Sequence, residues 1–290
     1  MQFIDTKDGV RLFYQELGSG VPVVFLHGAP LNSDFWEPQT NHLAERGCRC
    51  IAFDRRGHGR STRAFSGYDF DTLADDLAAV MDTLDLRDAI LVGHSVGTGE
   101  IARYLSRYGA DRVAGAVLVG GILPTVRQGP NAPDLFPPAF FEQTEQGMKH
   151  DRPAYYASIA PGFFGEQASR ETSDWIISMA LETSLRAHLE CNRSLATEDF
   201  TADLPNMTVP TLIVHGDADL AQPLALTAAR AHAAVPTSRL LVYEGAPHAL
   251  PLTHRERLNE DLVAFVQSVM SNCQLRTRIK PITTNRIMYE

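Results

Sequence analysis

The sequence predicts an α/β protein built on one mostly parallel, eight-stranded sheet with helices on both faces and a helical cap. Short apolar runs alternate with longer amphipathic segments, as in a sheet whose parallel strands are joined by crossover helices. Near the N-terminus two such runs are joined through Asp8-Gly9, which indicates an antiparallel hairpin at the sheet edge. The alternation stops between about residues 123 and 203, where an insertion without strands is expected. With 290 residues and 44% hydrophobic content, the chain has enough apolar material for a substantial core.

Each of the eight apolar runs is expected to be a strand. The first two form the antiparallel hairpin, and the other six are expected to be buried strands. The expected strands are residues 3–6, 11–16, 21–26, 49–53, 89–92, 113–119, 211–214 and 239–243. The clearest helix pattern is residues 72–81, where apolar side chains recur at i, i+4 and i+7.

The chain is expected to divide into a core in two parts, an insertion and a tail. The core covers residues 1–122 and 204–271, and residues 123–203 form the helical cap. The cap segment is rich in prolines and aromatics such as Phe140 and Trp175. Most of these aromatics are expected to attach the cap to the core, and roughly a quarter to line a pocket. Residues 272–290 have four basic residues against one acid and are expected to be a disordered or vector-encoded tail without a catalytic role.

Charge and targeting signals exclude several classes of protein. The net charge is −9, and acidic and basic residues are interspersed, so no positive surface for nucleic acid is expected. The N-terminus lacks the basic and long apolar regions of a signal peptide. No stretch approaches the 18 uncharged apolar residues of a membrane helix. The sequence therefore predicts a cytoplasmic protein that binds neither nucleic acid nor membrane.

Cysteine and histidine spacing predicts neither a disulfide framework nor a metal site. The four cysteines are expected to be free thiols, and Cys48 and Cys50 alternate in a strand so that both point to one face. The ten histidines include no arrangement with the spacing of a metal site. No metal or other cofactor is expected. The oligomeric state is left open, and a homo-oligomer is compatible with the sequence.

The strongest chemical signal is the pentapeptide Gly93-His94-Ser95-Val96-Gly97. It follows the apolar run 89–92 and precedes a helix pattern over 99–105, so it lies at a turn from strand to helix. The two glycines allow strand and helix to come close, and the serine hydroxyl is exposed on a strained turn. The pattern is that of a nucleophile elbow, and it predicts that Ser95 is a nucleophile.

A serine nucleophile needs a base and a buried acid, which are expected at later strand ends. Asp217 and Asp219 follow the strand 211–214, and both are candidates for the acid. His248 follows the strand 239–243 and is preferred as the base over His254, which lies among polar residues at a probable helix start. The carboxyl ends of parallel strands meet at one sheet edge, so these side chains are expected near Ser95.

Together these motifs resemble the cofactor-free haloperoxidase, arylesterase and perhydrolase branch of the α/β-hydrolases. The resemblance extends over residues 10–125 and 205–268, weakens in the insertion and is absent from the tail. Its motifs are the elbow, the two loops that hold the acid and the base, and the segments 25–30, 53–61 and 67–77. The resemblance implies an eight-stranded sheet with a helical cap after the sixth strand.

The resemblance also implies roles for particular residues. The triad becomes Ser95, His248 and Asp219, because the family acid is the second aspartate of Gly-Asp-x-Asp. The backbone N–H groups of Ala29 and Val96 form the oxyanion hole. Ala29 is smaller than the residue often found there, so a wider acyl pocket is expected. His27, His58 and His94 are expected to have structural roles.

The expected function is hydrolysis of small apolar or aryl carboxylic esters through an acyl-enzyme. The resemblance also raises peracid formation as a side activity, because peracid-forming members of the branch carry proline at the position of Pro30. The alternative is that Pro30 only rigidifies the turn. A lactonase and a carbon–carbon hydrolase share the triad, and a hydrolase-derived small-molecule receptor is a further alternative. Haloalkane and epoxide chemistry is excluded because it needs an aspartate in place of Ser95.

Overall fold

The computed structural model describes residues 2–130, 132–165 and 168–278, with 272–278 as backbone only. Its centre is an eight-stranded sheet with the strand order β1-β2-β4-β3-β5-β6-β7-β8. β1 pairs antiparallel with β2, and β2 with β4, while β3 to β8 pair in parallel. The strands are β1 Gln2–Asp5, β2 Arg11–Gly18, β3 Val21–Leu26, β4 Cys48–Phe53, β5 Ala89–His94, β6 Val113–Val119, β7 Thr211–Gly216 and β8 Ser238–Tyr243. The predicted eight-stranded, mostly parallel sheet is therefore confirmed.

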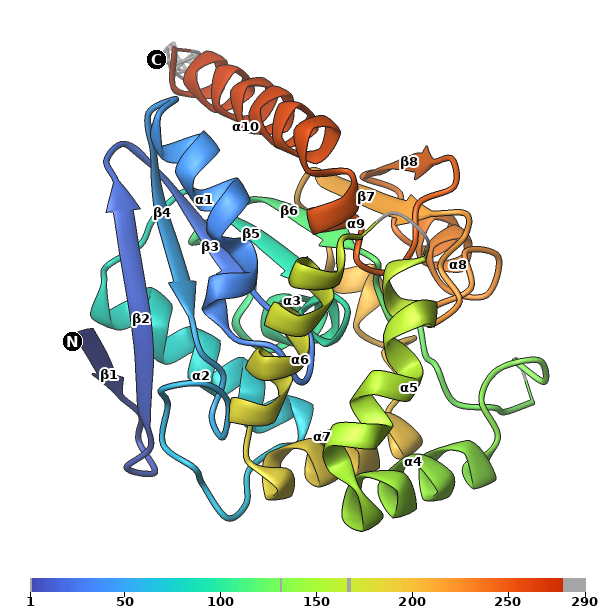
Figure 1. Ribbon diagram of the computed structural model, residues 1–290. Coiled ribbons are helices and arrows are strands. Elements are labelled where there is room, and N and C mark those ends of the chain that lie inside the picture. The colour runs from blue at the N-terminus through green and yellow to red at the C-terminus, as the bar shows by residue number, and fades with distance from the viewer. Residues whose placement is uncertain (1, 131, 166–167, 279–290) are drawn as a thin grey trace, which may run out of the picture.

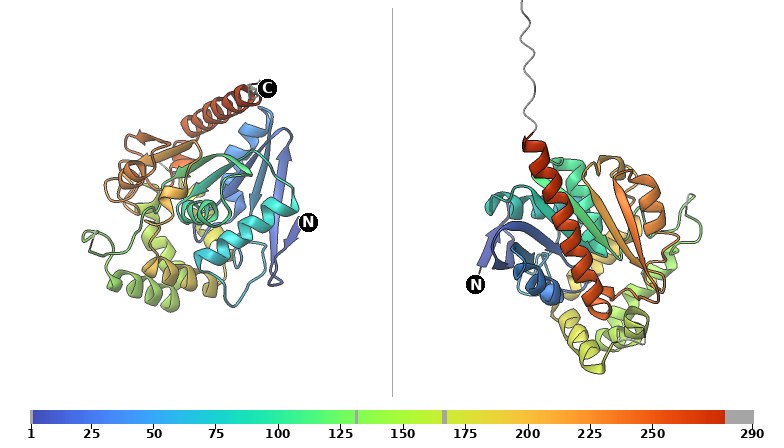
Figure 2. Two further views of the ribbon diagram at one scale, coloured as in Figure 1. Left: turned by 180° about the vertical axis from the view of Figure 1, so that it is seen from behind. Right: turned by 90° about the horizontal axis from the view of Figure 1, so that it is seen from above.

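Helices cover both faces of the sheet because successive side chains of each strand point to opposite faces. Val24 and Leu26 of β3 belong to one apolar core, whereas Val23 and Phe25 belong to the other. On the first face lie α2 (Phe70–Thr83), α3 (Val96–Tyr108) and α8 (Ala228–Ala234). On the second lie α1 (Glu37–Ala44), α9 (Leu250–Thr253) and α10 (Arg255–Arg278). Figures 1 and 2 show the resulting three layers.

The segment between β6 and β7 contains α4 (Pro138–His150), α5 (Arg152–Phe164), α6 (Arg170–Glu182) and α7 (Leu185–Thr197). Three of these helices begin at a polar residue whose side chain accepts a backbone N–H, namely Asp151, Ser169 and Ser184. Figure 1 shows the four helices gathered beside one end of the sheet, away from α10. The assignment of residues 123–203 to a separate cap domain stays a prediction. Two short 3-10 helices, Ser33–Trp36 and Leu204–Asn206, complete the described elements.

The final helix extends past residue 271, where the sequence predicts the start of a disordered tail. α10 runs to Arg278, and residues 272–278 contain neither proline nor glycine to end it. Residues 279–290 lie outside the described residues. None of the helices within the described ranges is long and apolar enough to cross a membrane.

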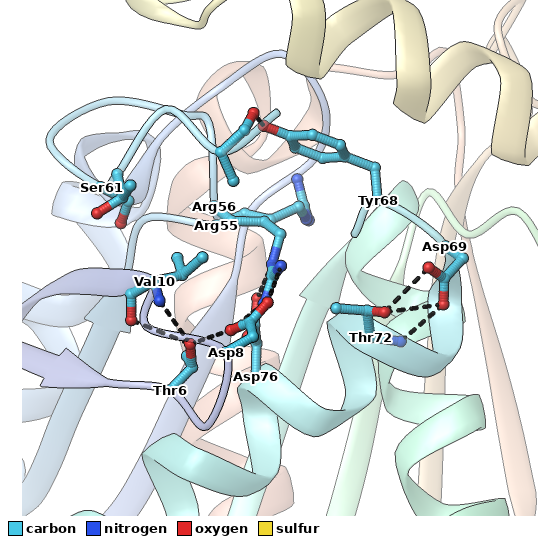
Figure 3. A network of polar contacts seen from close by, with 12 residues as sticks. Thr6, Asp8, Val10, Arg55, Arg56, Ser61, Tyr68, Asp69, Thr72 and Asp76 are labelled. Carbon is cyan, nitrogen blue, oxygen red and sulfur yellow. Dashed lines mark hydrogen bonds and ion pairs between the residues drawn. The ribbon is translucent and has the colours of Figure 1, made fainter. Parts of the chain in front are cut away.

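A buried arginine ties the N-terminal hairpin to the first face of the sheet (Figure 3). The Arg56 guanidinium donates two hydrogen bonds of 2.7 Å to Asp76 on α2 and one of 2.8 Å to Asp8 in the turn between β1 and β2. Arg56 and Asp76 are buried, so removing Arg56 would leave the Asp76 carboxylate inside the protein without its cation. This network fixes the loop that follows β4, and the same loop packs behind the candidate active site.

Candidate active site

Ser95 occupies the strained turn between β5 and α3. Its backbone has φ 51° and ψ −116°, a conformation that residues other than glycine seldom adopt. A Cβ atom at Gly93 would lie 2.7 Å from the backbone of Gly97, and one at Gly97 would lie 2.5 Å from the Leu26 carbonyl oxygen. Only glycine fits either position, so strand, turn and helix approach as the elbow pattern predicts.

His248 and Asp219 meet behind the elbow, each on the loop that follows its strand. His248 Nδ1 lies 2.7 Å from Asp219 Oδ2, and both side chains are buried. The other carboxylate oxygen, Oδ1, accepts the backbone N–H groups of Ala221 and Gln222 at 3.0 and 2.8 Å. Burial alone would raise the pKa of Asp219, but His248, His215 and the Gln222 N–H together lower it below its ordinary value. An ionised Asp219 holds a proton on Nδ1 of the imidazole and leaves Nε2 as the basic nitrogen.

The rival candidates for the acid and the base lie elsewhere. Asp217 Oδ1 accepts the backbone N–H of Gly245 at 2.6 Å and so braces the loops after β7 and β8. His254 Nδ1 lies 3.0 Å from the hydroxyl of its neighbour Thr253. Of the four candidates, the structure brings only Asp219 and His248 into contact with each other.

His94, which directly precedes Ser95, contacts the loop that carries His248. Its Nε2 lies 3.0 Å from the carbonyl oxygen of His248, and the two rings are 4.7 Å apart between centroids. Burial, and then the positive charge on a protonated His248, lower the pKa of His94 to about 3. A neutral His94 donates from Nε2, so it supports the loop of His248 rather than transferring protons. The Ser95 hydroxyl makes no hydrogen bond within the described part of the chain.

The two residues expected to supply the oxyanion hole, Ala29 and Val96, lie on segments next to Ser95. Val96 is the first residue of α3, where N–H groups have no partner within the helix and the helix dipole favours negative charge. Ala29 follows Gly28, which passes so close to the elbow that a Cβ atom there would lie 2.7 Å from His94 Nδ1 and 3.1 Å from Ser95 Cβ. Ala29 and Val96 therefore belong to two segments that meet at Ser95.

His27 and His58, the two other histidines expected to be structural, are buried and contact the backbone of nearby loops. His27 Nδ1 lies 2.8 Å from the Gly28 carbonyl oxygen, and its Nε2 accepts the backbone N–H of Arg55 at 2.9 Å. His58 Nδ1 lies 2.9 Å from the Arg56 carbonyl oxygen. Burial, with the nearby Arg55 charge, holds the pKa of both imidazoles well below the ordinary value. Neutral rings in these positions hold loops in place, as expected.

One buried ion pair behind the site has no clear signal in the sequence. Arg55 donates to the carbonyl oxygen of His27 at 2.6 Å and pairs with Glu100 on α3, and both charged side chains are buried. Burial raises the pKa of Glu100 to about 7, against the opposing effect of Arg55. Arginine and glutamate are ordinarily surface residues, so the sequence does not predict a buried pair here. In the folded chain, this pair joins the loop after β3, which carries His27 and Ala29, to α3, the helix that begins at Val96.

An apolar cavity of about 380 Å³ lies between the cap helices and the loop that holds Asp219. Its walls include Phe136, Phe140, Phe141, Tyr155, Phe163 and, from the Asp219 loop, Leu220. The ring of Phe163, one of the wall residues, lies 5.4 Å from the His248 ring between centroids, so one wall residue of the cavity contacts the imidazole. Several of the cap aromatics thus line a cavity, whereas Trp175 is not among the residues that line it.

Comparison with known proteins identifies the family. Residues 21–255 match the family model described as alpha/beta hydrolase fold. The non-heme chloroperoxidase CPO-A1 of Kitasatospora aureofaciens is 40% identical over 273 residues, which cover 92% of this chain and 99% of that protein. The bifunctional esterase/perhydrolase DCH of Acinetobacter calcoaceticus is 36% identical over 92% of this chain and all of its own length. The chain belongs to the α/β-hydrolase family and is a hydrolase enzyme.

Solved structures agree with this assignment. A bromoperoxidase from Bacillus anthracis superposes with a TM-score of 0.89 at 34% identity, covering 92% of this chain and 99% of that one. The esterase EaEST from Exiguobacterium antarcticum gives a TM-score of 0.89 at 33% identity over the same shares. The resemblance to the haloperoxidase, esterase and perhydrolase branch, first drawn from the sequence motifs, is confirmed.

Proposed function

We propose that this chain hydrolyses small apolar or aryl carboxylic esters through a Ser95–His248–Asp219 triad. The observation that carries the proposal is the buried 2.7 Å contact between His248 Nδ1 and Asp219 Oδ2, on two loops that meet beside the elbow serine. This contact gives the imidazole the tautomer that a general base needs. The esterase and esterase/perhydrolase names of similar proteins support the same reaction class.

In the proposed mechanism, Ser95 Oγ attacks the ester carbonyl carbon while its proton passes to Nε2 of His248. The resulting oxyanion accepts hydrogen bonds from the N–H groups of Ala29 and Val96. The tetrahedral intermediate collapses, and the departing alkoxide or phenoxide takes the proton from the imidazolium. Water then attacks the acyl-enzyme with His248 as the base, and release of the carboxylic acid restores Ser95.

The cavity supports an apolar substrate. The described residues that line it are mostly aromatic and aliphatic and include no charged side chain for an ionic substrate group, and its volume suits a small organic molecule. An aryl or short alkyl group bound there loses contact with water while its carbonyl reaches the elbow. Hydrogen peroxide can replace water in the second half of the reaction and would release a peracid. The esterase/perhydrolase relative and the presence of Pro30 beside Ala29 favour this second activity.

The proposal is tested by a panel of acetyl to octanoyl aryl esters and a set of lactones, assayed with wild type and Ser95→Ala. We expect turnover of at least one aryl ester at about 1 s⁻¹ or faster, and a loss of about 10⁴-fold or more in the variant. A parallel assay with acetate and hydrogen peroxide measures peracid. Ester turnover that survives in Ser95→Ala would contradict the triad, and turnover confined to lactones would reassign the substrate class.

A further inference from the structure

The N–H of Ala29 is oriented by a chain of peptide groups. The Gly28 carbonyl and the Ala29 N–H belong to one planar peptide unit, so fixing the direction of one fixes the other. The Gly28 carbonyl oxygen accepts the N–H of Leu31 at 2.9 Å and lies 2.8 Å from His27 Nδ1. The Leu31 N–H in turn shares its peptide unit with the carbonyl of Pro30. The orientation of the Pro30 carbonyl is therefore transmitted to Ala29.

A residue of the segment between β6 and β7 donates a hydrogen bond to the Pro30 carbonyl. Thr183 Oγ1 donates to the Pro30 carbonyl oxygen at 2.5 Å, and the threonine is 1% exposed. Thr183 is far from Pro30 in the sequence and follows the last residue of α6, in the short link to α7 (Figure 1). No other donor to the Pro30 carbonyl is found among the described residues.

The link that carries Thr183 is itself firmly anchored. Arg152, the first residue of α5, donates to the carbonyl oxygens of Thr183 and Leu181 at 2.7 and 2.8 Å. On the core side, the Ser184 N–H donates to the Gly57 carbonyl at 2.9 Å. The threonine hydroxyl therefore has a fixed position from which to hold the loop.

We propose that Thr183 is a positioning residue for the oxyanion hole, an inference that rests on the proposed esterase function. The hydroxyl donates to the Pro30 carbonyl, the Leu31 N–H donates to the Gly28 carbonyl, and the Ala29 N–H donates to the oxyanion. Each bond in such a series polarises the next, so the threonine strengthens as well as aims the last donor. The cap thereby contributes to stabilisation of the transition state without touching the substrate.

The test compares Thr183→Val, which keeps the shape and removes the hydroxyl, with Thr183→Ser, which restores it. Thr125→Val is the matched control, because Thr125 is also buried and donates to a backbone carbonyl, that of Glu198, at 2.9 Å. The readouts are kcat and KM for the best aryl ester, the inhibition constant of phenylboronic acid and the melting temperature. The boronic acid adds to the serine and places a negative oxygen in the hole, so its affinity reports the oxyanion donors directly.

We expect Thr183→Val to lower kcat by about tenfold or more with KM within about twofold. This is less than the roughly 10²–10³-fold loss caused by deleting an oxyanion donor, because the N–H is misaligned rather than removed. Boronate affinity should fall by a similar factor, and Thr183→Ser should restore both. A folded Thr183→Val with wild-type kcat, or equal losses of kcat and melting temperature in Thr183→Val and Thr125→Val, would overturn the inference alone. Absence of Ser95-dependent ester turnover in the wild type would overturn the proposed function and this inference together.

Discussion

Under the proposed function, Ser95 shows how a single residue is prepared for attack. Its positive φ costs about 1–3 kcal/mol relative to an ordinary conformation, and packing around Gly93 and Gly97 maintains it. In the proposed mechanism, this turn presents the serine hydroxyl to the substrate. The acid and base need no such strain, because strand ends already bring Asp219 and His248 together.

The assignment of the acid predicts a clear difference between two neighbouring aspartates. Asp219→Asn is expected to lower kcat by about 10³–10⁴-fold, because the amide can donate to Nδ1 and so favour the wrong tautomer. The loss should persist from about pH 5 to 9. The lowered pKa of Asp219 keeps the wild-type carboxylate ionised at every pH above the ordinary aspartate value of about 3.9.

Asp217→Asn is the matched control, since Asp217 accepts the Gly245 N–H and so holds a neighbouring loop. It should keep kcat within about threefold at equal folded fraction. A larger loss from Asp217→Asn than from Asp219→Asn would reverse the assignment.

The residues that the sequence predicts share one property, which is a position fixed by local pattern. Ser95 lies in a five-residue motif, and Asp219 and His248 follow recognisable strands. Thr183 and Arg55 carry no such pattern, because their roles arise from contacts with residues distant in sequence or on another element. Sequence periodicity describes which face of an element is buried, but it does not describe which loop a given hydroxyl reaches.

At the scale of elements, three of the four helices between β6 and β7, namely α4, α5 and α7, supply most of the cavity wall. Phe140 on α4 lines the cavity and stacks on Phe136 at 4.2 Å between ring centroids. Trp175 on α6 is 37% exposed and lies outside the set of residues that line this cavity. The sequence predicts that some cap aromatics line a pocket, but periodicity alone does not separate these two.

Because Phe140 lines the cavity and Trp175 does not, truncating Phe140 but not Trp175 is expected to change the acyl preference. Phe140→Ala should raise kcat/KM for octanoyl relative to acetyl aryl esters by about tenfold, because each additional methylene buried is worth about 0.8 kcal/mol. Trp175→Ala should leave that ratio unchanged. The measurement is the chain-length profile of both variants and wild type. Equal profiles for all three would make Phe140 an ordinary packing residue and remove this cavity from the substrate site.

At the scale of the whole molecule, the strands and their arrangement follow closely from the sequence. All eight expected strands form, and those at 21–26 and 113–119 have the expected bounds. The side chains of β3 alternate between the two apolar cores, so the strand appears in the sequence as a continuous apolar run because both faces of the sheet are covered. The end of α10 does not follow from the charge pattern. Residues 272–278 differ from the core in charge, but they can form a helix as well as the residues before them.

The fold brings three separate regions to one point: the elbow after β5, the loops after β7 and β8, and the Ala29 loop held by the cap. We propose that the side chains gathered there activate Ser95 as a nucleophile. The most direct measurement is covalent labelling with a fluorophosphonate, followed by intact mass and peptide mapping. One adduct on Ser95 in the wild type, none in Ser95→Ala and much slower labelling in Asp219→Asn are the predicted results. A label on another residue, or equal labelling of wild type and Ser95→Ala, would contradict the claim.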